Sequence, residues 1–577
     1  MCVCDNKDEA IVLNLCTDTR NGQARKEALA VAAATATVPA GIVPYVSAGT
    51  LLILGDEPRA LAAALRCNQL QGISPTVVIT GPVAAPAGIE RRDQDGITVL
   101  QARVGSLAGY LGAFQLTLAA AEDDAVINEV TRGRNLFDLV LDLTTPAFIN
   151  CQLLPPGYFA PGDDAAALQQ ALDDIPGLVG EFEKPQYFHY NATICAHGRS
   201  GMTACTRCLE ACPTDAITSL GNSIEVNPGL CQGAGSCATA CPTGAISYGY
   251  PRLGDSLDRL RVMLKAYRDN GGSDAVLLFH DGEAGHEVVA AVAAQLPEHI
   301  LPVAVEEAGS VGMDTWLSAF AYGAAAVILL GTSRTPPAVE NEIRMQLGTA
   351  HALLAGMGYS PDALLYTRQQ GADLVATISG VSLLANSEPA GFAGLDEKRT
   401  VIRLAVDHLF DVAAMKRPLV SLPTGAPFGE VLLDQARCTL CLACVSQCPA
   451  NALSAGNETP QLGFIEANCV QCGLCCRTCP EDAIAISPRY LYDFPTRNTR
   501  RILYEEEPYP CIVCGKPFAT RSVIENITKK MKGHALFQGT ALQRIKMCED
   551  CRVRDIYGDE AADAQIRVDP SKNGRAS

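Results

Sequence analysis

Two stretches, CTLCLACVSQCP at 438–449 and CVQCGLCCRTCP at 469–480, decide the fold of this chain. Both follow the C-x2-C-x2-C-x3-C-P spacing of bacterial-type iron–sulfur proteins. In that spacing three close cysteines converge on one cluster, whereas the cysteine before proline points to the neighbouring cluster. The rule predicts two [4Fe-4S] clusters, one on Cys438, Cys441, Cys444 and Cys479 and the other on Cys469, Cys472, Cys475 and Cys448. Cys476 is surplus, and we expect it to act as a small buried hydrophobe.

The end of this motif recurs elsewhere as an internal repeat. Its copies are CPTDAI (212–217), CPTGAI (241–246), CPANAL (448–453) and CPEDAI (479–484). The copies form two pairs whose members start 29 and 31 residues apart, which is the size of half a two-cluster ferredoxin domain. The repeat therefore predicts two such domains.

The first pair has lost two of the usual cysteines. Met202 stands at the first cysteine position of its first motif, and Cys195 lies seven residues earlier. If Cys195 takes the vacant place, one [4Fe-4S] cluster is held by Cys195, Cys205, Cys208 and Cys241. We expect His197 to be a solvated or supporting residue and not a ligand.

The second motif of this pair, CQGAGSCATACP, has Ala234 where its middle cysteine belongs. Only Cys212, Cys231 and Cys237 remain for that cluster. Three thiolates predict either a [3Fe-4S] cluster or an incomplete [4Fe-4S] cluster. The alternative is a vestigial ferredoxin fold without a cluster.

A third cysteine set lies near the C-terminus, at Cys511, Cys514, Cys548 and Cys551. Two C-x2-C knuckles separated by 33 residues predict a closed structural zinc site. Iron in a rubredoxin-like site is the alternative. The five cysteines without ligand spacing are expected to be ordinary ones, namely Cys2, Cys4, Cys16, Cys67 and Cys151.

The remaining sequence alternates strand-like and helix-like segments, which predicts parallel sheets with crossover helices. Before the first cysteine pair, strands are expected at 11–15, 51–55, 76–80, 97–100 and 137–143, with a helix at 58–70. Between the pairs, strands are expected at 275–279, 301–305 and 326–331, helices at 256–267 and 401–410, and a linker at 417–429. The turn after 51–55 lacks G-x-G-x-x-G, so no dinucleotide fingerprint is present.

These segments predict a multidomain α/β plus α+β protein with Rossmann-like parallel-sheet domains, two ferredoxin-like domains and a small zinc-ribbon or treble-clef-like domain. The expected divisions are an N-terminal α/β domain (1–183), a degenerate ferredoxin domain (184–253), a second α/β domain (254–370), a helical segment and linker (371–429), a two-cluster ferredoxin domain (430–497), and a cysteine-rich domain with a tail (498–577).

The composition indicates in which cellular compartment the chain is expected and which kinds of partner suit its charge. Twenty of the 25 cysteines lie in the three stretches above, and no signal peptide is visible. We therefore expect metal ligands and not disulfides, a cytoplasmic location and no membrane span. A formal charge of −18 disfavours nucleic acid and suits docking on a basic protein surface.

The segment from Cys438 to Pro480 closely resembles the two-[4Fe-4S] bacterial ferredoxin domain, and 194–247 resembles it in degenerate form. Residues 272–367, notably LPVAVEEAGSVGMDTWLSAFAYGAAAVILLG (301–331), resemble the domain that forms the delta subunit of methyl-viologen-reducing hydrogenases. In that family the domain carries a [2Fe-2S] cluster and links a hydrogenase or formate dehydrogenase to heterodisulfide reductase. Residues 272–367 contain no cysteine, so the resemblance implies a fold and a docking role without that cluster.

As a whole the chain resembles a polyferredoxin-type iron–sulfur protein. We expect it to relay single electrons between a dehydrogenase or hydrogenase, with formate dehydrogenase the preferred guess, and an acceptor. No nucleophilic triad, phosphate loop or HExxH motif is present. The alternatives are a docking or maturation factor for a metalloenzyme, and a flavin-dependent oxidoreductase with its site in residues 10–180.

Overall fold

The computed structural model describes residues 15, 19–80, 89–119, 123–130, 133–385, 388–457 and 459–558. The chain divides into two compact units. The first contains 1–195 and 206–416, and the second contains 196–205 and 417–577. The strand expected at 11–15 lies outside the described residues except for Leu15, which is helical.

A mainly parallel six-stranded sheet, ordered β4-β5-β3-β2-β8-β9, forms the first layer of unit 1. Its strands are β4 (Glu90–Gln94), β5 (Ile97–Gln101), β3 (Ser74–Ile79), β2 (Thr50–Gly55), β8 (Leu139–Asp142) and β9 (Tyr158–Phe159). Only β4 pairs antiparallel within this sheet. The four strands expected between 51 and 143 are confirmed, whereas the polar β4 and the two-residue β9 have no pattern that would predict them.

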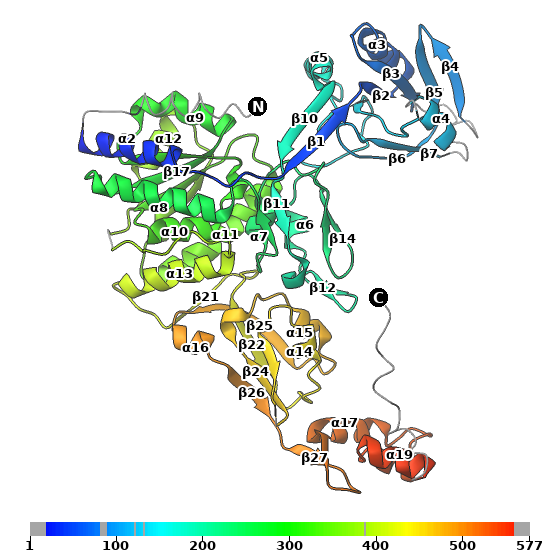
Figure 1. Ribbon diagram of the computed structural model, residues 1–577, viewed down its shortest axis with the longest axis vertical. Coiled ribbons are helices and arrows are strands. Elements are labelled where there is room, and N and C mark those ends of the chain that lie inside the picture. Colours follow the sequence, from blue (N-terminus) through cyan, green and yellow to red (C-terminus); the bar gives the residue numbers. More distant parts are fainter. Residues whose placement is uncertain are drawn as a thin grey trace. The chain divides into compact units, whose positions relative to one another are not determined.

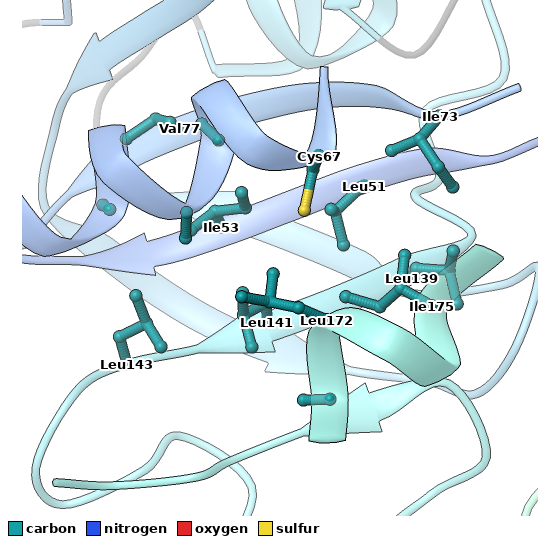
Figure 2. Close-up of a cluster of buried hydrophobic side chains, with 14 of the residues drawn as sticks. Leu51, Ile53, Cys67, Ile73, Val77, Leu139, Leu141, Leu143, Leu172 and Ile175 are labelled. Carbon is teal, nitrogen blue, oxygen red and sulfur yellow. The ribbon is translucent and has the colours of Figure 1, made fainter. Parts of the chain in front are cut away.

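The helix α3 (Glu57–Cys67) crosses from β2 to β3 and covers one face of this sheet. Its Cys67 points into a layer of aliphatic side chains from β2 and β8, including Leu51 and Leu141 (Figure 2). Cys67 is fully buried, and burial raises the pKa of its thiol to about 11. The sequence interpretation of Cys67 as an ordinary core cysteine fits this position.

Shorter elements of unit 1 surround this sheet. They are β1 (Ile42–Ser47) paired antiparallel with β10 (Gly180–Pro185), the hairpin of β6 (Val104–Ala108) and β7 (Gln115–Leu118), and the helices α4 (Asp123–Val130) and α5 (Ala165–Asp174). The β1–β10 pair is a two-stranded ribbon, where a proline such as Pro44 is tolerated.

A second, fully parallel sheet has the order β18-β17-β19-β20. Its strands are β17 (Val276–Asp281), β18 (Ile300–Val305), β19 (Ala326–Leu330) and β20 (Leu364–Thr367). The helices around it are α8 (Leu253–Asp269), α9 (Ala284–Val292), α10 (Met313–Ala321), α11 (Pro337–Gly356), α12 (Gly371–Ser379) and α13 (Lys398–Val412). The early helix α2 (Arg20–Ala33) packs along α8 (Figure 1). The three expected strands and both expected helices are confirmed.

The cysteine-rich part of unit 1 is built from small elements. They are β11 (Phe188–Tyr190) paired with β16 (Ile246–Tyr248), β14 (Ile217–Ser219) paired with β15 (Ile224–Val226), and the one-turn helices α6 (Arg207–Ala211) and α7 (Ser236–Ala240).

Unit 2 begins with the hairpin β12 (Gly198–Arg199) and β13 (Met202–Thr203). Its central elements are β21 (Leu419–Ser421), β22 (Gly429–Leu433), α14 (Ala443–Gln447), β23 (Leu453–Ala455), β24 (Gln461–Phe464), α15 (Leu474–Thr478), β25 (Ile484–Leu491), α16 (Phe494–Asn498) and β26 (Arg501–Glu505). The last elements are β27 (Pro508–Pro510), β28 (Pro517–Thr520), α17 (Arg521–Met531), α18 (Thr540–Arg544) and α19 (Glu549–Tyr557). The expected linker at 417–429 is therefore partly wrong, because β21 within it pairs with β25.

None of the described helices is long and apolar enough to span a bilayer.

The buried layer under α3 yields a stability prediction. Leu141→Ala should destabilise the six-stranded sheet by about 2–5 kcal/mol, because it removes a fully buried side chain and leaves a cavity. The same change at the exposed Leu65 of α3 is the matched control and should cost less than about 1 kcal/mol. The measurement is the free energy of unfolding of both variants in denaturant, with the rate of protease cleavage within residues 42–185 as the readout of this sheet. Equal destabilisation by both changes would contradict the assignment of this core.

Candidate iron–sulfur and metal centres

The CPxx repeat has a backbone cause. Its fourth residue is Asp215, Gly244, Asn451 or Asp482, and all four have positive φ, between 45° and 75°. Glycine, asparagine and aspartate are the residues that best tolerate this left-handed region. The repeated residues therefore form a left-handed turn directly after each Cys-Pro pair.

The C-x2-C-x2-C loops have their own left-handed positions. In the second ferredoxin-type segment these are Leu440 and Leu442 in one loop and Gln471 and Gly473 in the other, with φ between 51° and 77°. They flank the middle cysteine of each loop. Such a conformation is unusual for leucine, and it curls the loop so that three sulfurs face one side.

The two predicted four-cysteine sets of unit 2 line two separate hollows. Cys438, Cys441, Cys444 and Cys479 line the first hollow. Cys448, Cys469, Cys472 and Cys475 line the second. In each hollow, as the spacing predicts, the fourth sulfur comes from the opposite motif. The donor sets therefore fit two four-iron clusters.

Hydrogen bonds to sulfur support these sets. The backbone N–H of Leu440 donates to the Cys438 Sγ (3.4 Å), and those of Ala452 and Ala483 donate to the sulfurs of Cys448 (3.2 Å) and Cys479 (3.3 Å). The Gln471 Nε2 donates to the Cys469 Sγ at 3.2 Å. Such donors stabilise thiolates and tune cluster potentials. The two alanines are the fifth residue of the CPxxA repeat, so the repeat also fixes a donor.

The surplus Cys476 follows a ligand candidate directly. Its thiol is half-buried and hydrogen-bonds to Cys475, and this bond lowers the pKa of Cys476 to about 7. Its side chain is thus less buried than the small buried hydrophobe that the sequence suggested.

In unit 1, Cys195, Cys208 and Cys241 belong to one small core with Ile217 and Ile246. Tyr190 lies against this group, and burial together with a hydrogen bond to Cys195 raises its pKa to about 12. The structure thus brings Cys195 beside two of its predicted co-ligands.

The fourth predicted member, Cys205, ends the β12–β13 hairpin of unit 2. Its N–H donates to the Ala196 carbonyl (3.3 Å), and its own carbonyl accepts from the Nδ1 of the buried His197 (2.8 Å). His197 therefore braces the cysteine backbone, as expected for a supporting residue. The Met202 sulfur accepts from the Thr478 hydroxyl at 3.9 Å.

The second cluster site predicted in unit 1 lacks one cysteine, because Ala234 stands in its place, and we call it the edited site. Its three remaining cysteines lie close together. Burial and the neighbouring Cys231, Cys212 and Cys208 raise the pKa of the Cys237 thiol well above its ordinary value. Cys212 also lies near enough to Cys231 to raise its pKa. Cys212, Cys231 and Cys237 therefore lie near one another, and Cys208 of the other set lies near Cys237 as well.

The loop around Ala234 keeps the backbone of an intact cluster loop. Gly233 and Gly235 have φ of 79° and 76°, matching Leu440 and Leu442. A Cβ on Gly235 would lie 2.3 Å from the Ser310 Cα, and one on Gly233 would lie 3.0 Å from the Tyr187 ring. Packing thus requires glycine at 235, where a Cβ would meet backbone atoms, and favours it at 233, whereas the conformation alone is also adopted by leucine in the other loop. Sequence reasoning missed Tyr187 and Ser310, because nothing local links them to this loop.

The third cysteine set forms a compact donor site. The sulfurs of Cys511, Cys514, Cys548 and Cys551 all lie within 4.8 Å of one another and could bind a metal ion. Burial opposes ionisation of Cys511, but N–H donors that include Cys514 and Cys548 lower its pKa to about 6. Cys548 immediately precedes α19, so the start of that helix faces the sulfurs.

Comparison with known families supports the cysteine-based domains. The family described as 4Fe-4S dicluster domain matches residues 203–245, and the 4Fe-4S binding domain family matches residues 431–454. The chain therefore contains two ferredoxin-type 4Fe-4S domains.

The chain is also similar to "Hydrogenase-4 component A" of Escherichia coli (strain K12), with 48% identity over 40 residues. The matched segment makes up 7% of this chain and about a fifth of the length of that relative.

The left-handed turns predict a contrast between two variants. Asn451→Val should lower the cluster content of the 438–480 segment, because a β-branched residue at φ of 50° costs about 1–2 kcal/mol. Asn451→Gly should retain full content, since glycine adopts this conformation freely. Iron and acid-labile sulfide per chain are measured for both. Loss of iron in the glycine variant as well would show that the asparagine side chain, and not the turn, matters.

Proposed function

We propose that this chain is an electron carrier that relays single electrons between a redox enzyme and an acceptor. The proposed ligands are the sets given above, with two [4Fe-4S] clusters in 438–480, a third on Cys195, Cys205, Cys208 and Cys241, and an altered one on Cys212, Cys231 and Cys237. Such clusters supply reversible one-electron transfer when bound. The protein supplies ligands, sulfur hydrogen bonds and burial.

The observation that carries the relay is the proximity of Cys205 and Cys472 within unit 2. Burial, together with Cys448, Cys469 and Cys205, raises the pKa of Cys472 to about 12. The Gln447 Nε2 donates to the Ser200 hydroxyl (2.8 Å), and the Arg477 guanidinium donates to the Thr203 carbonyl. The proposed ligand Cys205 therefore lies near the proposed ligand Cys472 of another set within unit 2. A relay between ferredoxin modules needs this arrangement, whereas a scaffold does not.

The partner is proposed from similarity alone. The relative is named as a hydrogenase component, and residues 272–367 resemble the delta subunit of a hydrogenase. A hydrogenase or formate dehydrogenase on one side of the relay is the preferred assignment. The surplus of carboxylates, 63 against 45 basic residues, suits docking on a basic surface of that partner.

The 511–551 site is proposed to hold structural zinc. Four thiolates within range of one ion match the tetrahedral Cys4 arrangement that this metal prefers. All four positions are protein ligands, so the ion would stabilise the segment around it and leave no place for a substrate.

A reductive titration followed by EPR tests the relay. We expect several clusters that reduce at separate potentials, and Cys472→Ala should remove the signal of one of them. Signals from the 438–480 clusters alone would leave the first domain without a redox role. That outcome would favour the docking or maturation alternative.

The missing ligand can be restored. Ala234→Cys should convert the altered cluster into a complete [4Fe-4S] cluster, with loss of the oxidised [3Fe-4S] EPR signal and a gain of about one iron per chain. The backbone already has the loop conformation, and Ala234 faces open space at a cavity. Ala33→Cys, on an exposed helix position, is the matched control and should change neither quantity. No gain in iron would contradict an altered but functional site.

Removal of the fourth thiolate tests the metal site. Cys551→Ala should lose about one zinc per chain by elemental analysis, since three thiolates hold the ion far more weakly. The segment 508–558 should then be cleaved faster by protease. Cys67→Ala, which removes a buried cysteine elsewhere, should keep the zinc. Iron in place of zinc in the parent protein would support the rubredoxin-like alternative.

A further inference from the structure

A cavity of about 670 Å³ lies within unit 1, at the carboxyl ends of the second parallel sheet. Its wall includes Asp281 at the end of β17, Glu306 just beyond β18, and Thr332 just beyond β19. The order β18-β17-β19-β20 reverses direction between β17 and β19. Open parallel sheets bind ligands outside their carboxyl ends at such a reversal. Both the size and the place of this cavity suit a small organic molecule.

The opposite wall comes from the edited ferredoxin loop. Gly233 and Ala234 line the cavity, so the position of the deleted cysteine faces it. Tyr248 joins the two walls, because its hydroxyl donates to the Gly233 carbonyl (2.7 Å) and lies within electrostatic range of Glu306 and Glu307. A molecule in the cavity would therefore touch the loop that lacks its cysteine.

Phosphate-bearing cofactors do not suit this cavity. Three helices start at its sheet edge, and side chains already occupy their first N–H groups. The Asp281 carboxylate accepts from Gly285 at α9 (2.9 Å), the Gln346 Oε1 from Met313 at α10 (3.1 Å), and the Gln152 Oε1 from Ala338 at α11 (2.8 Å). Each helix start therefore has one donor fewer for a phosphate, and the carboxylates of the lining would repel it.

The charge of the lining favours a cation. Seven carboxylates line the cavity, against two arginines and one lysine. Two of these three cations are engaged: Arg334 pairs with Glu283, and the buried Lys398 donates to the carbonyls of Ala238 and Thr239. The lining therefore carries excess negative charge.

Three side chains of the lining form no hydrogen bond or ion pair with the described residues, although the ring of one of them, His286, packs against that of His280. His286 is 93% buried, and no hydrogen bond to its ring nitrogens is formed by any described residue. Neither the Glu306 nor the Glu307 carboxylate has a hydrogen-bond or ion-pair partner within the described part of the chain, although the Glu307 backbone carbonyl accepts from Ser310. Burial raises the pKa of Glu306, and burial together with Asp281 and Glu283 raises that of Glu307 to about 7. A bound cation would relieve this crowding of carboxylates.

We propose that this cavity binds a phosphate-free organic cation against the edited cluster loop. His286, Glu306 and Glu307 supply its polar contacts, and the loop at Ala234 forms one wall. The position beside a cluster rests on the proposed function, whereas the cavity and its charge do not.

Isothermal titration of the full chain as isolated tests binding without electron transfer. The probes are two organic dyes of similar size, methylene blue, a cation, and indigo disulfonate, an anion. We expect one methylene blue per chain and no indigo disulfonate. Binding of both dyes, or of neither, would overturn the proposal, and the reductive titration above would still stand by itself.

Variants locate the site. Ala304→Trp fills the cavity from β18 and should weaken methylene blue binding more than tenfold. Glu307→Gln should weaken it roughly fivefold, as expected for loss of one partly screened charge pair. Glu27→Gln removes the same charge from the exposed face of α2 and should have no effect. If all three variants bind equally, the dye binds the acidic surface and the proposal fails. The Glu307 change is isosteric, so it keeps the test valid if Ala304→Trp folds poorly.

Discussion

Convergence of several thiolates on a small volume is the constraint on which this structure depends. Sulfurs brought together as thiolates repel one another, so the backbone must hold them in place and solvate their charge. The chain meets both needs locally. Left-handed residues such as Leu442 and Asn451 turn the loops inward, and N–H groups such as that of Ala452 donate to sulfur. The CPxx repeat thus recurs at four places because each place needs the same left-handed turn after its cysteine and proline.

The loop around Ala234 shows that the backbone turns of a cluster loop can be kept although one cluster ligand is missing. Gly233 and Gly235 keep the left-handed turns although the cysteine between them is alanine. Ser310 packs against one glycine and Tyr187 against the other, so neighbouring elements now hold a shape that a cluster ligand would otherwise help to hold. A vestigial loop under no constraint would not need both glycines. The retention of Cys212, Cys231 and Cys237 beside one another agrees with an altered centre.

Much of this architecture could be predicted because its causes are local. Cysteine spacing sets the two hollows of 438–480, and hydrophobic runs such as 51–55 and 326–331 mark buried parallel strands. The missed features depend on residues distant in sequence. The hairpin at 198–203 belongs to unit 2, β21 pairs with β25, and the cavity wall combines Ala234 with Glu306. No periodicity or spacing within a short window records such contacts.

The structure also indicates what would make the cluster potentials unequal. Each predicted set in 438–480 has comparable sulfur donors, so hydrogen bonding alone gives those two centres similar potentials. The edited set also keeps a backbone donor at Cys231 and another at Cys237. It differs in having one thiolate fewer, because Ala234 replaces the middle cysteine of its loop. Loss of a negative ligand raises a cluster potential, whereas burial away from water disfavours added negative charge and lowers it. The cavity at Ala234 admits solvent or a ligand on the open side, which weakens the second effect. For the cluster proposed on the edited set, we therefore expect the loss of the ligand to dominate and to raise its potential above those of the other proposed clusters.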